Sequence, residues 1–387
     1  MAHPRLASLY SADTRNDPKE LQEVQMVLVA QSYDFVVGID THSRTHTLAI
    51  ISAVTGAEIS NETFPSTSTG MKRALRWISR RSTSDKSRVL LSMEGTGSYG
   101  AKLRQLATES DYRVIEAPFP ERRIGRKRGK SDSIDAARAA RAVLGIETDE
   151  LREPRAGQHH MALRVLTVAR TAMVRERTAA INSLIALLRV VDLGIDLRKS
   201  LTPKTIETIA AWRTRDEGIG TRVSRSEATR LARQILALDD QLEQNRADMA
   251  MLVQQNSHAL LDMPGVGPIS AAAILTAWSH PGRVRSEAAL AALAGTCPIP
   301  ASSGGTTRYR LNRGGDRQLN KAIHTIAVVR MRWHQETREY VARRTREGRN
   351  KKEIIRCLKR YITRQIFRTL STAGEVFSGH APSRLAC

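Results

Sequence analysis

The chain has 387 residues, enough for two or three domains, and 41% of them are apolar, enough for buried cores. Its 61 Lys and Arg against 39 Asp and Glu give a net charge of +22, which predicts a polyanionic partner, nucleic acid before an anionic membrane. Without an apolar run of roughly 18 residues, a signal peptide or a CxxC pair, we expect a cytoplasmic protein with no membrane span, disulfide framework or zinc site.

The first third of the chain predicts an α/β domain. Residues 1–33 are expected to form a poorly ordered extension, in which Met26 is an alternative start. The apolar run at 35–40 suits a strand buried on both faces, and alternation predicts two more strands in a meander. The remaining predicted elements are, in order, strands at 45–51 and 58–64, a helix at 68–80, a strand at 89–93, a helix ending near 108 and a strand at 112–115.

Carboxylates follow the ends of two predicted strands, and two more open a later helix. Asp40 ends the first strand and Glu94 ends the fourth, where ligands usually bind in α/β folds. Asp132 and Asp135 are three residues apart, so they project from one helix face. Two anions held together repel unless a cation lies between them, so such a pair makes a divalent metal site possible. The alternative is that Asp132 caps the helix and Asp135 complements its positive end.

Three motifs in this order resemble those of the DEDD transposases of bacterial insertion sequences, in the family numbered one hundred and ten. They are V-G-I-D at 37–40, M-E-G-T-G at 93–97 and K-S-D-S-I-D-A at 130–136. The resemblance implies a ribonuclease-H-like (RuvC-like) domain at 34–151 and a metal-binding tetrad of Asp40, Glu94, Asp132 and Asp135. Magnesium is the expected ion, because it prefers hard oxygen ligands and substrate phosphates.

A basic cluster directly precedes the acidic pair. It consists of Arg126, Lys127, Arg128 and Lys130. Cations beside a metal site would contact the phosphates of the strand that is cut. The alternative is an ordinary solvated run of charge.

Residues 152–254 are predicted to be helical. One long amphipathic helix is expected over 163–191. A second carries a heptad seam with one polar position, formed by Leu231, Ile235, Leu238, Leu242, Asn245, Met249 and Leu252. The seam predicts either packing against a neighbouring helix or a dimerising coiled coil. The resemblance favours the coiled coil and implies a homo-oligomer, a dimer or a tetramer.

Residues 255–370 are predicted to form a mostly helical, basic C-terminal domain, followed by a loose tail at 371–387. The glycines of P-G-V-G, Gly265 and Gly267, precede a helix, and the turn resembles the hairpin of helix-hairpin-helix DNA binders. The alternative is a tight turn with no ligand. From 306 to 368 there are 19 Lys and Arg against 5 Asp and Glu, which favours nucleic-acid binding.

A serine loop lies within this domain. By composition alone, Ser-Ser-Gly-Gly at 302–305 reads as a flexible loop, followed by phosphate-binding arginines: Arg308, Arg310, Arg313 and Arg317. The same family carries a G-x-x-P stretch, a Ser-Gly and an Arg-Gly-Gly turn, which match Gly295, Pro298, Ser303 and the turn at 313–316. The resemblance implies that Ser303 is a nucleophile toward DNA phosphate, and the adjacent Ser302 is the alternative nucleophile.

The resemblance therefore implies a transposase that cuts and rejoins double-stranded donor and target DNA through a phosphoserine, guided by a noncoding RNA. One alternative is a Holliday-junction-type endonuclease, in which the tetrad activates water and the serine only binds phosphate. Another is a nucleic-acid-binding protein without catalytic activity.

Overall fold

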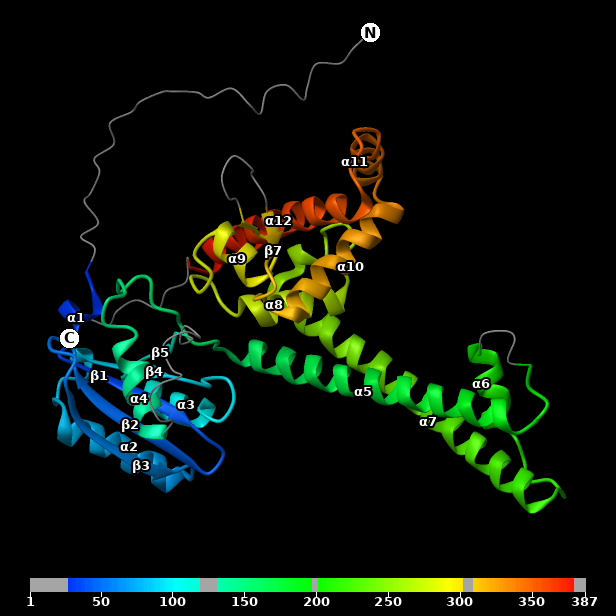
Figure 1. Cartoon of the computed structure of the whole chain (residues 1–387), viewed down its shortest axis with the longest axis horizontal. Coiled ribbons are helices and arrows are strands. Elements are labelled where there is room, and N and C mark those ends of the chain that lie inside the picture. The colour runs from blue at the N-terminus through cyan, green and yellow to red at the C-terminus, as the bar shows by residue number, and fades with distance from the viewer. Residues whose placement is uncertain (1–26, 119–130, 197–200, 302–308, 379–387) are drawn as a thin grey trace, which may run out of the picture. The chain divides into compact units, whose positions relative to one another are not determined.

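The computed structural model describes residues 27–118, 131–196, 201–301 and 309–378 (Figure 1). The chain forms two compact units that divide between Pro154 and Arg155. The first is built on a mixed β-sheet, and the second is mainly helical. This confirms the predicted α/β domain followed by a helical C-terminal part. The finer predicted division of the second unit at 254/255 stays a prediction.

A five-stranded mixed sheet forms the centre of the first unit, in the order β3-β2-β1-β4-β5. Its strands are β1 (Phe35–Thr41), β2 (Thr45–Ser52), β3 (Glu58–Pro65), β4 (Val89–Met93) and β5 (Arg113–Glu116). β1 pairs antiparallel with β2 and parallel with β4. The predicted meander of three strands is confirmed, because β2 pairs in turn with β3.

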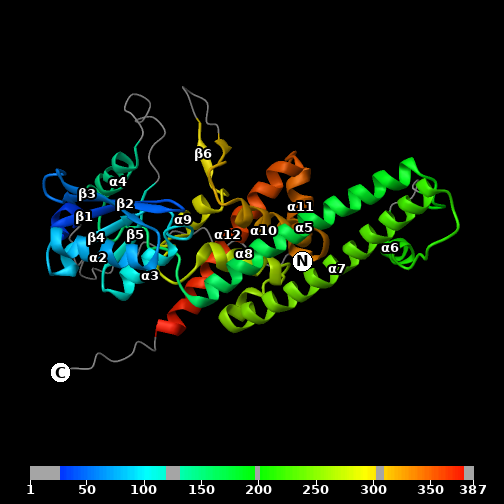
Figure 2. The same cartoon turned by 90° about the horizontal axis from the view of Figure 1, so that it is seen from below.

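Helices cover both faces of this sheet. α2 (Ser68–Arg81) and α3 (Ala101–Glu109) lie on one face, and α4 (Asp132–Arg141) lies on the other (Figure 2). Neighbouring residues of a strand point to opposite faces. Val37 therefore packs in the core below α2, whereas Val36 packs in the core below α4.

The short helix α1 (Val29–Ser32) joins the core on the α4 face. Val29 is fully buried and Tyr33 is buried beside it. The predicted poorly ordered extension therefore does not include residues 27–33, because burying these two side chains gives that segment a fixed place.

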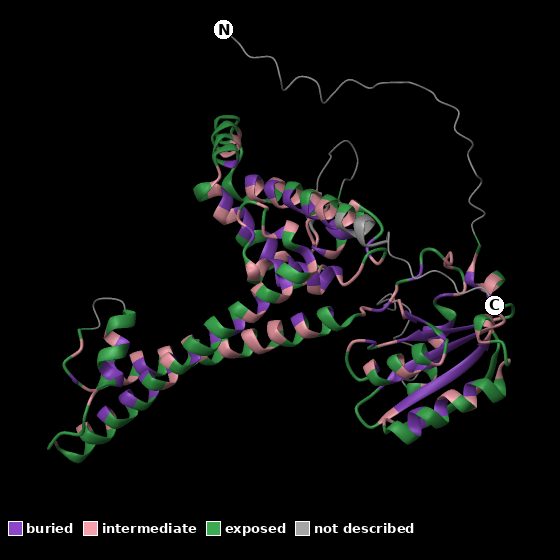
Figure 3. Ribbon diagram, turned by 180° about the vertical axis from the view of Figure 1, so that it is seen from behind, coloured by how far each residue is buried: buried purple, intermediate pink, exposed green. Residues whose placement is uncertain are grey.

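The second unit contains all the remaining elements. They are α5 (Gln158–Val190), α6 (Pro203–Ala210), α7 (Ile219–Ser257), α8 (Pro268–Trp278), α9 (Glu287–Leu293), β6 (Pro298–Pro300), β7 (Tyr309–Leu311), α10 (Arg317–Trp333), α11 (Gln335–Arg346) and α12 (Lys351–Ser378). A short 3-10 helix lies at His258–Leu260 in this unit, and another at Lys86–Arg88 in the first unit. Buried residues follow the facing sides of these helices (Figure 3). Among the described residues, no helix is long and apolar enough to cross a bilayer.

The heptad seam of α7 packs against α5 of the same chain, and the two long helices lie side by side (Figure 1). The polar position of the seam is buried, and Asn245 donates its side-chain N–H to the carbonyl of Leu166 on α5 at 3.1 Å. In return, Arg170 of α5 donates to the Leu242 carbonyl at 2.8 Å. Of the two readings of the seam, the structure therefore shows packing against a neighbouring helix.

Candidate metal centre and nucleic-acid surface

Two of the predicted carboxylates lie at the same end of two neighbouring parallel strands. Asp40 lies near the end of β1, and Glu94 directly follows β4. The register pairs Ile39 with Met93, and the backbone N–H of Glu94 donates to the carbonyl of Ile39 at 3.0 Å. The apolar strands thus bring Asp40 and Glu94 to one edge of the sheet.

The other two carboxylates reach this edge because α4 lies directly against β1. Gly38 leaves no room between them, since a Cβ on this residue would overlap the main chain of α4 and lie 2.7 Å from the nitrogen of Ala140. The first turn of α4 carries Asp132 and Asp135. The glycine of the V-G-I-D motif is therefore the residue that allows the helix, and both carboxylates, to approach Asp40.

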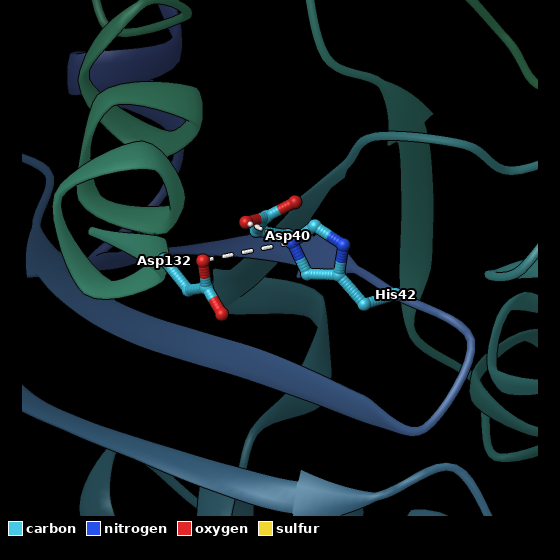
Figure 4. Close-up of side chains that lie close together, drawn as sticks. All are labelled: Asp40, His42 and Asp132. Atoms are coloured by element: carbon cyan, nitrogen blue, oxygen red, sulfur yellow. Dashed lines mark hydrogen bonds and ion pairs between the residues drawn. The ribbon is translucent and has the colours of Figure 1, made fainter. Parts of the chain in front are cut away.

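A histidine joins Asp40 and Asp132 at the centre of the cluster. The Nε2 atom of His42 lies 3.1 Å from Oδ2 of Asp40 and 3.7 Å from Oδ1 of Asp132 (Figure 4). One ligand atom from each of the three residues lies within 4.8 Å of the other two. His42 is not among the site residues predicted from the sequence. Its position two residues after Asp40, on the same side of an extended chain, is the pattern that could have indicated it.

Glu94 and Asp135 lie beside this group, but they are not among the three residues whose ligand atoms lie within 4.8 Å of one another. Burial raises the pKa of Glu94, and the negative charges of Asp40 and Asp135 raise it further. Asp135 accepts a hydrogen bond from Nη1 of Arg138 at 2.7 Å. Ser131 occupies the helix cap position, so Asp132 lies inside the first turn rather than at the cap.

The donor set fits a divalent cation. Its carboxylates come from three separate elements, and after burial the negative charges of Asp40 and Asp135 are the next causes of the raised pKa of Glu94. Oxygen and imidazole nitrogen donors at these separations are those that divalent ions accept in proteins. The four predicted carboxylates thus gather at one edge of the sheet, with His42 added to them.

We expect Gly38→Ala to disrupt this centre from a distance. The added methyl group must push α4 away from β1, which should cost about 1–3 kcal/mol of stability and lower the affinity for divalent ions. Thermal unfolding with and without Mg²⁺ or Mn²⁺ measures both effects. Gly145→Ala is the matched control, because its Cβ would meet nothing within 4 Å. Wild-type ion affinity in Gly38→Ala would contradict the role given to this glycine.

The predicted nucleic-acid contacts fall into two groups. Arg310, Arg313 and Arg317 are exposed around the end of β7 and the start of α10, where phosphate could reach them. Outside the described residues lie the other predicted basic residues, Arg126, Lys127, Arg128, Lys130 and Arg308, and the two serines, Ser302 and Ser303.

The predicted hairpin glycines form the turn that leads into α8. Gly265 has a φ of +76°, a conformation that favours glycine, and Gly267 is the exposed N-cap of the helix. No side chain caps this helix start. The turn is held from below by the buried Arg330, whose Nε donates to the carbonyl of Pro264 at 2.6 Å. Pro268, the first residue of α8, has no backbone N–H, so only the N–H groups that follow it could bind an anion at this helix start.

A basic pocket of about 440 Å³ lies between α5, α8 and the start of α10. Three arginines line it, Arg155, Arg164 and Arg175, together with threonines of α5. Burial lowers the pKa of nearby His160 to about 4, with the positive charges of Arg155 and Arg164 adding to the effect. Asp316 also lines the pocket, 3.6 Å from Arg155, so the three arginines leave a net positive charge that favours an anionic occupant such as a phosphate group.

Comparisons with known proteins agree with this arrangement. A family model of the IS110 DEDD transposases, described as a transposase, matches residues 37–191, which include all four carboxylates. A second model, described as the transposase IS116/IS110/IS902 family, matches residues 257–342. The chain is also 26% identical over 280 residues to an uncharacterized 42 kDa protein of insertion element IS900 from Mycobacterium paratuberculosis, covering 61% of this chain and 70% of that protein. With the two models covering more than half of its length, the chain belongs to the IS110 family of DEDD transposases, enzymes that act on DNA with a divalent metal ion.

Proposed function

We propose that this transposase cuts and rejoins DNA through a phosphoserine at Ser303, with Mg²⁺ held by Asp40, Glu94, Asp132 and Asp135. The observation that carries the proposal is the gathering of these four carboxylates at one sheet edge. The strand order, with carboxylates after β1 and β4 and on α4, supports a ribonuclease-H-like domain of the RuvC type at 34–151.

The residues of the chain divide the chemistry between them. When bound, Mg²⁺ would lower the pKa of a hydroxyl group and neutralise charge on the phosphate. The carboxylates hold the ion in place, and Ser303 supplies the nucleophile, which is weak on its own near neutral pH. Its Oγ forms a bond to phosphorus while the bond from phosphorus to O3′ breaks, and the proton ends on the new 3′ hydroxyl. Reversal on another 3′ hydroxyl rejoins the strands without hydrolysis.

A two-stranded stem flanks the proposed serine loop in the sequence. β6 and β7 pair antiparallel on either side of it. At their base, Gly315 crosses Gly295 so closely that a Cβ on Gly315 would lie 2.7 Å from the Cα of Gly295 and 2.8 Å from the carbonyl oxygen of Leu293. The backbone N–H of Asp316 donates to the same carbonyl at 2.6 Å. The close contact of Gly295 with Gly315 thus holds both ends of the stem beside the end of α9.

We expect Gly315→Ala to separate this stem from α9. All the atoms that the new methyl group would meet belong to the main chain, so stability should fall by about 1–3 kcal/mol and formation of the protein–DNA adduct should fall with it. Gly314→Ala is the matched control, because its Cβ would come no closer than 3.4 Å to Oδ1 of Asn312. Thermal unfolding and adduct yield measure the two effects, and equal behaviour of both variants would contradict the proposed close crossing.

The exposed arginines of the second unit support a DNA partner. We propose that the exposed arginines at 310, 313 and 317, the hairpin before α8 and the basic pocket contact the phosphates of donor and target DNA. We further propose a noncoding guide RNA that pairs with both DNAs, and a homo-oligomer, a dimer or a tetramer. Either the fold of one subunit or a second subunit must bring Ser303 to the carboxylates.

The test is a reconstituted reaction with donor and target DNA, Mg²⁺ and the structured noncoding RNA encoded beside the gene. A denaturing gel should show protein linked covalently to DNA, and the linked species should require both Mg²⁺ and the RNA. Strand cleavage without linked protein would indicate the Holliday-junction-type endonuclease instead. A complete absence of cleavage under these conditions would indicate a binding protein without catalytic activity.

A further inference from the structure

His42 lies where a ligand of the metal ion would lie. It follows Asp40 by two residues, on the same side of the extended chain, and its Nε2 reaches both Asp40 and Asp132. Its side chain is about half exposed, as is that of Asp132, whereas Asp40 is only 10% exposed. The imidazole and the carboxylate of Asp132 are thus the exposed groups of the site, and Asp40 is the buried one.

The distances suit shared coordination as well as a hydrogen bond. Donor atoms about 2.1 Å from one ion lie about 3.0 Å apart at right angles and about 3.6 Å apart at 120°. The separations of 3.1 Å and 3.7 Å from His42 Nε2 to its two carboxylate partners fall at these values. These two separations are therefore compatible with one ion bound by His42 and both carboxylates.

We infer that His42 is a nitrogen ligand of the divalent ion at this centre, and that it shifts the preference of the site from Mg²⁺ toward a transition metal such as Mn²⁺. Mg²⁺ takes oxygen ligands and retains water in place of a nitrogen donor, whereas transition ions gain from imidazole. The inference rests on the proposed metal site and adds a fifth side chain to it.

The first measurement uses the full-length protein and Mn²⁺ alone. Pulsed electron paramagnetic resonance of the bound ion should show coupling to a ¹⁴N nucleus in the wild type. His42→Ala should remove that coupling and lower Mn²⁺ affinity at least about tenfold, as loss of a supporting group at a metal site commonly does, while Mg²⁺ affinity changes less. Calorimetric titration with each ion gives the two affinities. If His42→Ala fails to fold, His42→Gln retains the size and polarity of the side chain without an imidazole.

A neighbouring histidine provides the control. His46 pairs with Thr41 across β1 and β2, so it lies on the sheet face opposite to Asp40. It is fully buried, and neither ring nitrogen has a hydrogen-bond partner among the described residues, so His46→Leu is a substitution that the core should accept. His46→Leu should keep the nitrogen coupling.

The outcomes separate this inference from the proposed function. Bound Mn²⁺ without nitrogen coupling in the wild type, or coupling that persists in His42→Ala, would overturn the role of His42 and leave the carboxylate site standing. Failure of the wild type to bind either ion would overturn both.

Discussion

Ser303→Ala should abolish the covalent protein–DNA adduct and recombination while leaving DNA and RNA binding nearly unchanged. The substitution removes the only oxygen of that side chain, and with it the atom that would bond to phosphorus. The basic residues of the second unit, which we propose to supply the binding energy, are not altered. A denaturing gel measures the adduct, and a mobility-shift assay at fixed salt concentration measures binding.

The adjacent hydroxyl group makes a matched control for this result. Ser302→Ala removes the same group one residue earlier, and it should form adduct at close to the wild-type yield. An adduct of normal yield in Ser303→Ala would refute the serine assignment. Loss of the adduct in Ser302→Ala alone would transfer the role to Ser302.

Asp135→Asn should lower metal-dependent DNA cleavage by about 10- to 100-fold, which is the usual cost of losing a group that supports a bound ion. The amide retains an oxygen that can still accept the hydrogen bond from Arg138, so the local structure should persist. What changes is the charge, which also contributes to the raised pKa of Glu94. The raised pKa should therefore move back toward the ordinary value of a glutamate.

The readouts for this variant are cleavage rate as a function of Mg²⁺ concentration and the carboxylate titration of Glu94. Asp149→Asn makes the same chemical change at an exposed position of the same unit and should behave as the wild type. Wild-type recombination by Asp135→Asn would remove Asp135 from the metal site.

The strands of the first unit could be predicted because their pattern is local. The apolar residues at 35–40 indicate a strand buried on both faces, and β1 begins at Phe35 as expected. Asp40 and Glu94 could be placed at one edge for the same reason, since each directly follows or ends such a run. The glycine turn before α8 likewise has a local cause, the positive φ of Gly265.

The partner of the α7 seam could not be predicted from the same kind of pattern. A heptad repeat shows that a helix needs an apolar neighbour, but the spacing is the same whether that neighbour belongs to the same chain or to another. In the structure, the neighbouring helix is α5 of the same chain. The hydrogen bonds of Asn245 and Arg170 satisfy the polar groups at the contact.

The sequence by itself determined the strands, the long helices and the order of the four carboxylates, because these depend on residues close together in the chain. The tertiary structure alone decided which side chains meet. Gly38 lets α4 lie against β1, and only that packing brings Asp132 within reach of His42 and Asp40. A distance between residues on separate elements depends on how closely their backbones pack, and the periodicity of the sequence does not predict it.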